Sequence, residues 1–538
     1  MGNKRTNLIK YATQDFEVKN YFGNVERIPD ILGIEKRDFG AYYTDEQIAN
    51  YILDHLDIRP GSYVLDPSCG CGSFVFPLYY RILKNRKKRL DGLYGVDIDN
   101  KAVEYTINTI LKMSRGLNRE EVLGHIINRD FIFKQRDLVD GTDIWQEKLT
   151  EILQEGGFDF IVGNPPFNLN NHKKMKPVLS KAIHREIAKE HGNIPIYFIL
   201  RGLELLKKGG TLAFVLPKTL LYVGKYHDFR SYILNNFSIL KITEIGIKFK
   251  GVRGEQIVLF IKNEKPTANS AIVFTNLTKE GSQGACRPFK VPQSYFSIMD
   301  GIPTMPNELA YQLVRKLKEK SVQILDFREI DVCRGVSLGK ARLETIPYEG
   351  DRVIPTNAFI KGKDISKLHL KSLTIVEEHL YKSSELSRIK KPKIILQNIY
   401  SSESGLISYL DKQCLPTTET VTNIIMADRR KLAYVHALLN SKLINFYLSQ
   451  VVFSRSRLTM HLDRYYLRQL PLLWDPSREE TTKLVTLGEQ SVYTNPDDVK
   501  YTLKEIDKLV YRLYGINDHG RLAVEDIMSK TLSHKSLW

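Results

Sequence analysis

The sequence predicts an α/β protein in which a doubly wound, mainly parallel sheet precedes a mixed α+β domain. In residues 39–263, short β-branched or apolar runs alternate with segments of helical length. Strands that alternate with helices form a parallel sheet covered on both faces. From residue 326 onward the pattern changes to short β-like runs, followed by a long amphipathic segment at residues 431–452. This change of pattern predicts a second domain of a different class.

Six runs in the first domain are predicted to be buried strands, because each is short, apolar and bounded by turn residues. They are residues 62–66, 93–97, 125–130, 158–163, 211–217 and 257–262. Residues 45–56 and 196–210 have helical periodicity, and the second of these is expected to end in a glycine cap. Residues 307–320 and 498–515 predict further helices, the latter closed by Gly515.

Length and composition indicate several globular domains. At about 150 residues per domain, 538 residues predict two to four domains. We expect an N-terminal extension, the α/β domain, a connector, the α+β domain and a helical tail, at residues 1–38, 39–263, 264–325, 326–474 and 475–538. No stretch approaches the roughly 20 apolar residues of a membrane span, and the N-terminus lacks an apolar signal core. With five cysteines, an odd number, the expected location is the reducing cytoplasm, without a membrane.

The charge favours a partner that carries phosphates. Lys and Arg exceed Asp and Glu by 79 − 62 = 17, and the sequence pI is near 9.3. Residues 326–474 contain 23 Lys and Arg against 15 Asp and Glu, so this segment holds +8 of the +17. A basic bias of this kind is typical of proteins that bind nucleic acid.

A glycine-containing loop, residues 66–74 (DPSCGCGSF), follows the first predicted strand. No Lys-Ser or Lys-Thr pair follows its glycines, which excludes a Walker A loop. Asp97 ends the next predicted strand, where an acid can accept hydrogen bonds from a ribose diol. Asp130 and Phe131 follow the third run, and there they can hold and stack an adenine. Acids at three consecutive strand ends predict a ligand pocket, because ligands of open α/β sheets bind at those ends.

The fourth predicted strand is followed by Asn164-Pro165-Pro166-Phe167. The two prolines continue neither a strand nor a helix, so they predict a rigid extended loop. Its carbonyl groups can accept both hydrogens of an amine on a planar ring, while Phe167 offers a flat apolar face. Hydrogen bonds to both amine hydrogens turn the nitrogen lone pair out of conjugation and toward an electrophile.

Together these motifs resemble the S-adenosylmethionine-dependent DNA adenine-N6 methyltransferases of type II restriction–modification systems. The resemblance covers about residues 39–263, in the motif order of the gamma class, and implies a Rossmann-like catalytic domain with a C-terminal target-recognition domain at residues 326–474. By resemblance, the cofactor-binding residues are Tyr43, Thr44, Asp66, Cys69, Gly70, Asp97, Ile98, Asp130 and Phe131.

The resemblance also implies a mechanism and a partner. The methyl group would pass from the cofactor directly to N6 of an adenine flipped out of double-stranded DNA. Residues 164–167 would be catalytic, with Phe249 stacking on the other face of the base. The candidate DNA contacts are Arg455, Arg457, Lys390, Lys391 and Lys393. No metal is expected, and a cognate restriction endonuclease would act on the same site without a stable complex.

Two alternatives remain open. Cytosine-N4 methylation uses similar chemistry, although that class more often has Ser at the position of Asn164. A non-catalytic DNA-binding subunit would keep the fold without the reaction. Cytosine-C5 methylation is excluded because it needs a cysteine nucleophile, typically after proline, and the sequence has no Pro-Cys pair.

Overall fold

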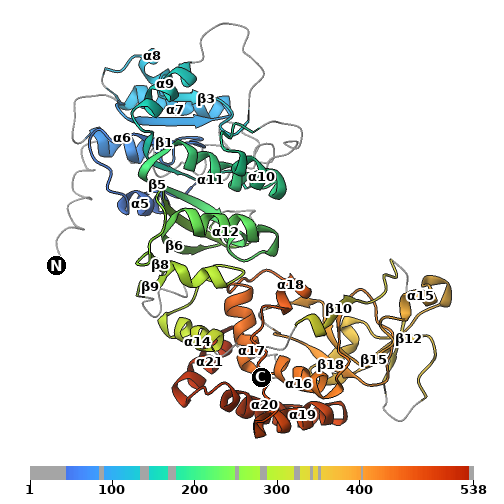
Figure 1. Cartoon of the computed structure of the whole chain (residues 1–538). Helices are drawn as coiled ribbons and strands as arrows, with labels where there is room; N and C mark the ends of the chain where they lie inside the picture. Colours follow the sequence, from blue (N-terminus) through green and yellow to red (C-terminus); the bar gives the residue numbers. More distant parts are fainter. Residues whose placement is uncertain are drawn as a thin grey trace. The chain divides into compact units, whose positions relative to one another are not determined.

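The computed structural model describes residues 44–83, 90–114, 116–133, 144–167, 177–248, 254–278, 287–319, 327–339, 343–348, 353–401 and 404–531. The chain forms two compact units (Figure 1). The first comprises Met1–Leu220 and Lys225–Met299, and the second comprises Leu221–Gly224 and Asp300–Trp538.

Within the described residues, the first unit is built on a nine-stranded sheet with the order β3-β2-β1-β4-β5-β7-β6-β8-β9. The strands are β1 (Val64–Asp66), β2 (Leu93–Asp97), β3 (Ile126–Asn128), β4 (Phe158–Gly163), β5 (Leu206–Pro217), β6 (Ser238–Gly246), β7 (Gln256–Lys262), β8 (Ala271–Asn276) and β9 (Phe289–Pro292). Strands β3, β2, β1, β4 and β5 are parallel neighbours, and β7 runs antiparallel to both β5 and β6. All six predicted strands are present, and the predicted mainly parallel sheet is confirmed.

Helices cover both faces of this sheet. They are α5 (Glu46–Asp54), α6 (Val75–Leu83), α7 (Asn100–Met113), α8 (Arg119–Leu123), α9 (Ile144–Gln154), α10 (Ala182–His191), α11 (Ile194–Leu205) and α12 (His227–Asn236). Buried residues of α5, α6 and α7 form one core cluster with Val162 of β4 and Ala213 of β5. Gly202 of α11 instead faces Ile161 and Leu212, the alternate residues of the same two strands. Since successive side chains of a strand point to opposite faces, α11 covers the other face and the sheet is doubly wound.

Two expectations about the first unit differ from the observed fold. The predicted glycine cap after residues 196–210 is wrong, because Leu206 is already extended and pairs with Phe158 of β4. Sheet pairing therefore ends α11 at Leu205, and Gly209 lies inside β5 with φ of +81°. Residues 264–299, expected to be part of a connector, add β8 and β9 to the sheet, because Ile272 and Phe274 alternate inward.

The second unit has the predicted mixed α+β composition. Its larger sheet has the order β10-β19-β16-β18, formed by β10 (Asp331–Arg334), β19 (Val421–Ile425), β16 (Lys393–Gln397) and β18 (Ser408–Asp411). A three-stranded sheet is formed by β11 (Glu344–Pro347), β15 (Ser372–Ile375) and β12 (Ala358–Phe359). Two small pairs are β13 (Ile365–Ser366) with β14 (His369–Leu370), and β17 (Ile399–Tyr400) with β20 (Met460–His461).

The described residues of the second unit also form eight α-helices. They are α14 (Glu308–Glu319), α15 (Ser383–Leu386), α16 (Arg429–Leu439), α17 (Lys442–Tyr447), α18 (Arg464–Leu467), α19 (Glu479–Gln490), α20 (Val499–Leu513) and α21 (Asp518–Thr531). The predicted continuous helix at 431–452 is interrupted, because Asn440 caps the end of α16 and the Ser441 hydroxyl caps the start of α17. A π-helical turn, Leu448–Val452, follows α17. Helix α19 packs on α16, and α21 packs on α17.

Candidate functional site

Three of the predicted site residues lie at one edge of the nine-stranded sheet. Asp66 is the last residue of β1, Asp97 is the last residue of β2, and Asn164 follows β4 directly. Strand β1 lies between β2 and β4, and all three run parallel. After β1 the chain therefore adds β2 and β3 on one side of it, and later adds β4 and β5 on the other side. The carboxyl edge at such a reversal of strand order is where open α/β sheets bind ligands.

The glycine loop after β1 holds the Asp97 carboxylate in place. Gly70 donates a hydrogen bond from its backbone N–H to Asp97 Oδ2 at 2.8 Å, and Asp99 N–H donates to Asp97 Oδ1 at 2.9 Å. Gly70 adopts φ of +48°, a left-handed conformation that glycine adopts at little cost. The Thr106 hydroxyl on α7 donates to the Gly70 carbonyl at 2.8 Å and fixes the loop from the other side.

Asp66 lies deeper, and its carboxylate is only partly satisfied. Ser68 N–H donates to Asp66 Oδ1 at 3.1 Å, and the side chain is 1% exposed. Within the described part of the chain, Asp66 Oδ2 and the hydroxyls of Ser68 and Ser73 are buried without a hydrogen-bond partner. Because buried polar atoms are nearly always hydrogen-bonded, these three atoms indicate a polar ligand.

The three acids at the strand ends share an electrostatic feature. Burial raises the pKa of Asp66 well above its ordinary range, with the Ser68 N–H opposing and the Asp97 charge adding to the shift. Burial raises the pKa of Asp97 to about 6, against the Asp99 and Gly70 N–H groups. Burial also raises the pKa of Asp130. Such shifts concentrate where a protein holds carboxylates for a ligand rather than for its own fold.

Cys69, in the same loop, has no chemical role that its environment supports. Burial raises the pKa of its thiol well above the ordinary range, and the negative charges of Asp97 and Asp66 add to this. Since the thiolate is the reactive form of cysteine, Cys69 is a small neutral side chain of the pocket wall.

Aromatic and aliphatic side chains bound the pocket beyond Asp97. Asp130 Oδ1 accepts hydrogen bonds from the N–H groups of Ile132 at 2.9 Å and Phe133 at 3.0 Å, which stabilises the turn that carries Phe131. The Phe131 ring lies 5.3 Å from the ring of Phe198 on α11, centroid to centroid. Ile98, directly after β2, is 40% exposed although it is apolar.

The segment 164–167 begins against Asp66. A side-chain carbon on Gly163 would lie 2.9 Å from Asp66 Oδ1, so only glycine lets the end of β4 approach this closely. Asn164 and Pro166 line the same pocket as Asp66 and Asp97. Phe167 does not line it: its side chain is buried in the core cluster of α5, α6 and α7.

The structure thus brings most of the predicted cofactor residues together. One pocket is lined by Thr44, Asp66, Cys69, Gly70, Asp97, Ile98, Asp130, Phe131 and Asn164. Tyr43 and Phe249 lie outside the described residues. The pocket is also lined by residues that were not predicted, namely Pro67, Ser68, Ser73, Phe74, Asp99, Arg129, Ile132 and Phe198. Most are near neighbours of the motif residues, but nothing in the uniformly apolar first turns of α11 distinguishes Phe198.

The predicted DNA contacts lie in the second unit and differ from one another. Lys390, Lys391 and Arg457 are exposed. Arg455 is half-buried at a turn where Ser454 and Arg455 both have positive φ, +49° and +59°. Two consecutive non-glycine residues in this conformation indicate a strained corner, a feature often found at functional sites.

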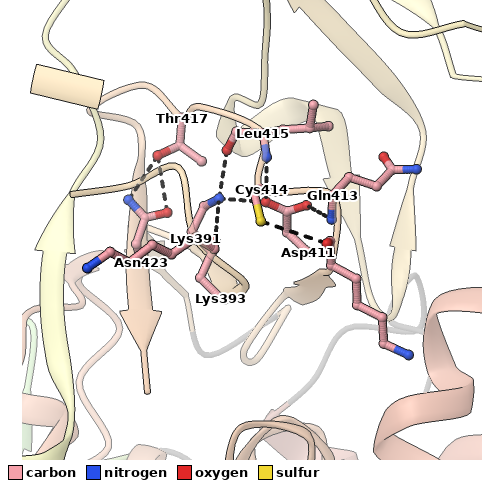
Figure 2. Close-up of polar contacts among 9 residues, drawn as sticks. Lys391, Lys393, Asp411, Gln413, Cys414, Leu415, Thr417 and Asn423 are labelled. Atoms are coloured by element: carbon pink, nitrogen blue, oxygen red, sulfur yellow. Dashed lines mark hydrogen bonds and ion pairs between the residues drawn. The ribbon is translucent and has the colours of Figure 1, made fainter. Parts of the chain in front are cut away.

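The prediction for Lys393 is wrong. Its side chain is fully buried, and its ammonium group donates to Asp411 Oδ2 at 2.5 Å and to the Leu415 carbonyl at 2.6 Å (Figure 2). Lys393 begins β16, in the middle of the larger sheet of the second unit, so its side chain points into the core. An ammonium group held in this way is not available to a DNA phosphate.

The described His, Cys, Asp and Glu residues include no group of three or more that could hold a metal ion. Among the described helices, none is both long enough and apolar enough to span a membrane.

Two family models match successive parts of the chain. The model of the Eco57I restriction–modification methylase matches residues 91–249, which include Asp97, Asp130 and the segment 164–167. The model of the TaqI-like C-terminal specificity domain matches residues 357–472, in the second unit.

Individual relatives agree with these matches. The modification methylase CviBIII of Paramecium bursaria Chlorella virus NC1A is 28% identical over 204 residues, 37% of this chain and 43% of the relative. The type II methyltransferase M.PaeR7I of Pseudomonas aeruginosa is 31% identical over 196 residues, 34% and 32% of the two chains. The type II restriction enzyme and methyltransferase RM.Eco57I of Escherichia coli is 23% identical over 272 residues, 42% and 27%.

In each of these relatives, the aligned region covers less than half of the relative's own length. The order of the matches is nevertheless the predicted one, with the methylase motifs first and the specificity domain after them. Residues 91–249 thus match an Eco57I-type restriction–modification methylase, residues 357–472 match a TaqI-like C-terminal specificity domain, and the relatives of the chain include type II methyltransferases.

Proposed function

We propose that this protein transfers a methyl group from S-adenosylmethionine to N6 of an adenine that is flipped out of double-stranded DNA, at a specific sequence. The observation that carries the proposal is the position of Asn164, which lines one pocket together with Asp66 and Asp97. An amine acceptor and two carboxylates that suit a cofactor are thereby brought to the same site.

The described residues fit S-adenosylmethionine. When bound, this cofactor supplies an activated methyl group on a sulfonium centre. The partner-free Asp66 Oδ2 and the serine hydroxyls beside it suit the charged methionine end. Asp97, held by two backbone N–H groups, would accept hydrogen bonds from the ribose hydroxyls. Ile98, Phe131 and Phe198 would bound the adenine ring of the cofactor.

In the proposed reaction, the Asn164 side-chain carbonyl and the Pro165 backbone carbonyl accept the two hydrogens of the adenine amine. The nitrogen lone pair would then point to the methyl carbon that the bound cofactor supplies, and a C–N bond would form as the C–S bond broke with its electron pair left on sulfur. The methylated amine, cationic at that point, would lose one proton to solvent water. Holding amine and methyl group in line also removes much of the entropic cost of the encounter.

Phe167 would stack on the flipped adenine. Because its side chain is buried in the core cluster in this structure, stacking requires the ring to turn out toward the base. Phe249 would stack on the other face. Flipping costs a few kcal/mol of unstacking, which these contacts would offset.

The second unit would select the DNA sequence. Exposed Lys390, Lys391 and Arg457, with Arg455, would contact phosphates, which position a protein on DNA without specifying sequence. Methylation would protect the site from a cognate restriction endonuclease that acts separately.

The test is methyl transfer to plasmid DNA from a tritiated donor, followed by mass analysis of the nucleosides. We expect N6-methyladenine from the wild-type protein. Asn164→Ala is expected to lower the rate by at least roughly a hundredfold, the effect of removing one hydrogen-bonding group aimed at the reacting atoms, while cofactor affinity is unchanged. If the product is N4-methylcytosine, the target base is cytosine and not adenine. Absence of transfer by the wild type would indicate a non-catalytic subunit.

A further inference from the structure

The second unit contains a cavity that the proposed reaction does not use. Three chain segments meet there, around Leu338, around Lys361 and Lys363, and around Thr418 to Thr420. We propose that this cavity reads the major-groove edge of a G·C base pair and fixes one position of the DNA sequence. The inference rests on the proposed function, since it names what the specificity domain recognises.

The frame of the cavity is made by backbone hydrogen bonds, so its polar groups are held in fixed positions. Thr418 N–H donates to the Ile360 carbonyl at 3.1 Å, and Glu419 N–H donates to the Val336 carbonyl at 2.9 Å. Gly362 N–H donates to the Thr420 hydroxyl at 3.0 Å. A site that reads bases needs this rigidity, because a displaced hydrogen-bonding group no longer discriminates.

Two lysines supply hydrogen-bond donors. The Lys361 side chain is half-buried, whereas Lys363 is exposed, and the Lys363 ammonium contacts the Thr345 hydroxyl at 2.9 Å. Burial lowers the pKa of Lys361 and the positive charge of Lys363 lowers it further, against the negative charges of Asp364 and Glu419. Because Lys361 and Lys363 line the same cavity, they suit a ligand that presents two adjacent acceptors.

Glu419 supplies an acceptor beside these donors. The Leu338 N–H donates to Glu419 Oε2 at 3.1 Å, which fixes the orientation of the half-buried carboxylate. The Thr418 and Thr420 hydroxyls lie 2.8 Å apart and link the buried and exposed sides of the cavity. Two lysine donors and an oriented carboxylate acceptor thus line the same cavity.

This combination favours a base-pair edge over a phosphate. A phosphate would meet the like charge of the Glu419 carboxylate. Guanine presents two adjacent acceptors in the major groove, O6 and N7, which lysine binds, and its cytosine partner presents the N4 amine, which a carboxylate accepts. The lysines and Glu419 together match a G·C pair.

The experiment selects duplexes from a random pool with the full-length protein and sequences those that stay bound. The variants are Lys363→Met and Glu419→Gln, with Lys500→Met as the control, because Lys500 is an exposed lysine of α20 in the same unit. We expect the wild type and the control to require a G·C pair at one position. Both test variants should accept other pairs there, with discrimination reduced roughly tenfold or more, and melting temperatures should be unchanged.

Two outcomes overturn the inference. In one, both test variants enrich the same sequence as the wild type. In the other, affinity falls uniformly for all duplexes and its dependence on salt weakens, which identifies a phosphate contact. Lys390→Met removes a proposed phosphate contact and provides the reference for a uniform loss of affinity with weaker salt dependence. The selection measures DNA binding only. Methyl transfer is measured in the plasmid assay, and failure of the wild type in that assay contradicts the proposed function but not this inference.

Discussion

Asp66 and Asp411 are both buried carboxylates, but their surroundings differ in one respect. Asp66, at the end of β1, is 1% exposed and receives a single backbone hydrogen bond, from Ser68. Asp411, at the end of β18, is fully buried and accepts hydrogen bonds from Lys393 Nζ and from the N–H groups of Gln413 and Leu415 (Figure 2). Both oxygens of Asp411 accept hydrogen bonds, whereas Asp66 Oδ2 has no hydrogen-bond partner among the described residues.

These two carboxyl groups illustrate two uses of a buried charge. Burial raises the pKa of both carboxyl groups, but the ammonium of Lys393 opposes the shift at Asp411, whereas the negative charge of Asp97 adds to it at Asp66. A buried acid with a counter-ion and satisfied oxygens is part of the fold. A buried acid without these partners, beside a second acid, indicates a binding site.

Loss of the buried counter-ion is expected to have the largest effect on stability. Lys393→Met leaves Asp411 charged and buried without its partner, and should lower the free energy of unfolding by about 3–5 kcal/mol. Denaturant unfolding of the full-length protein measures this. Lys391→Met, two residues away and exposed, is the control and should change stability by less than about 0.5 kcal/mol. Equal stability of the two variants would contradict the structural role of the pair.

The converse change is expected at Asp66. Asp66→Asn removes a buried charge that the fold does not need, so the free energy of unfolding should be unchanged or slightly higher. Affinity for S-adenosylmethionine should fall roughly ten- to a hundredfold, the value of one or two hydrogen bonds to a charged group. Calorimetric titration measures the affinity. Asp411→Asn should show the reverse, with lower stability and unchanged affinity per folded molecule; a loss of affinity there as large as at Asp66 would remove the distinction.

A third expected effect is a pH dependence at Asp97. Its pKa is about 6 in the folded protein, against about 3.9 in an unfolded chain. The folded state therefore binds the proton more tightly, and this group lowers folding stability as the pH rises from about 4 to 6. The Asp97→Asn variant should gain stability relative to the wild type across that range.

The same titration should appear in cofactor binding. The ionised carboxylate accepts two hydrogen bonds from a diol, so wild-type affinity should rise as the pH increases through about 6. Affinity of Asp97→Asn should be weaker and without this step. Parallel curves for the two proteins, measured by calorimetry at each pH, would show that Asp97 does not contact the cofactor.

Much of the candidate site was predictable because it follows from strand order. Asp66, Asp97 and Asn164 each stand at a strand end, and parallel strands place those ends at one edge whatever the loops between them do. Phe198 was not predictable in this way. It belongs to a helix in which every residue from Ile194 to Leu200 is buried, and only packing decides which of these side chains faces the pocket.

Lys393 shows the same limit in the second unit. In the run RIKKPK it is chemically identical to Lys390 and Lys391, which are exposed. What distinguishes it is Asp411, 18 residues later on a neighbouring strand, and a pairing over that distance leaves no local pattern.

The sequence by itself determined the strand–helix alternation, the three acids and the Asn-Pro-Pro-Phe segment at strand ends, and thereby the first domain and its binding edge. These depend on short-range periodicity and on turn chemistry, which act within a few residues. Only the tertiary structure decided which charges are paired, that Phe167 lies in the core, and that Lys361, Lys363 and Glu419 share a cavity. The burial of side chains and the pairing of charges depend on segments that are distant in the sequence. These segments come into contact only in the folded chain, so no local pattern reveals them.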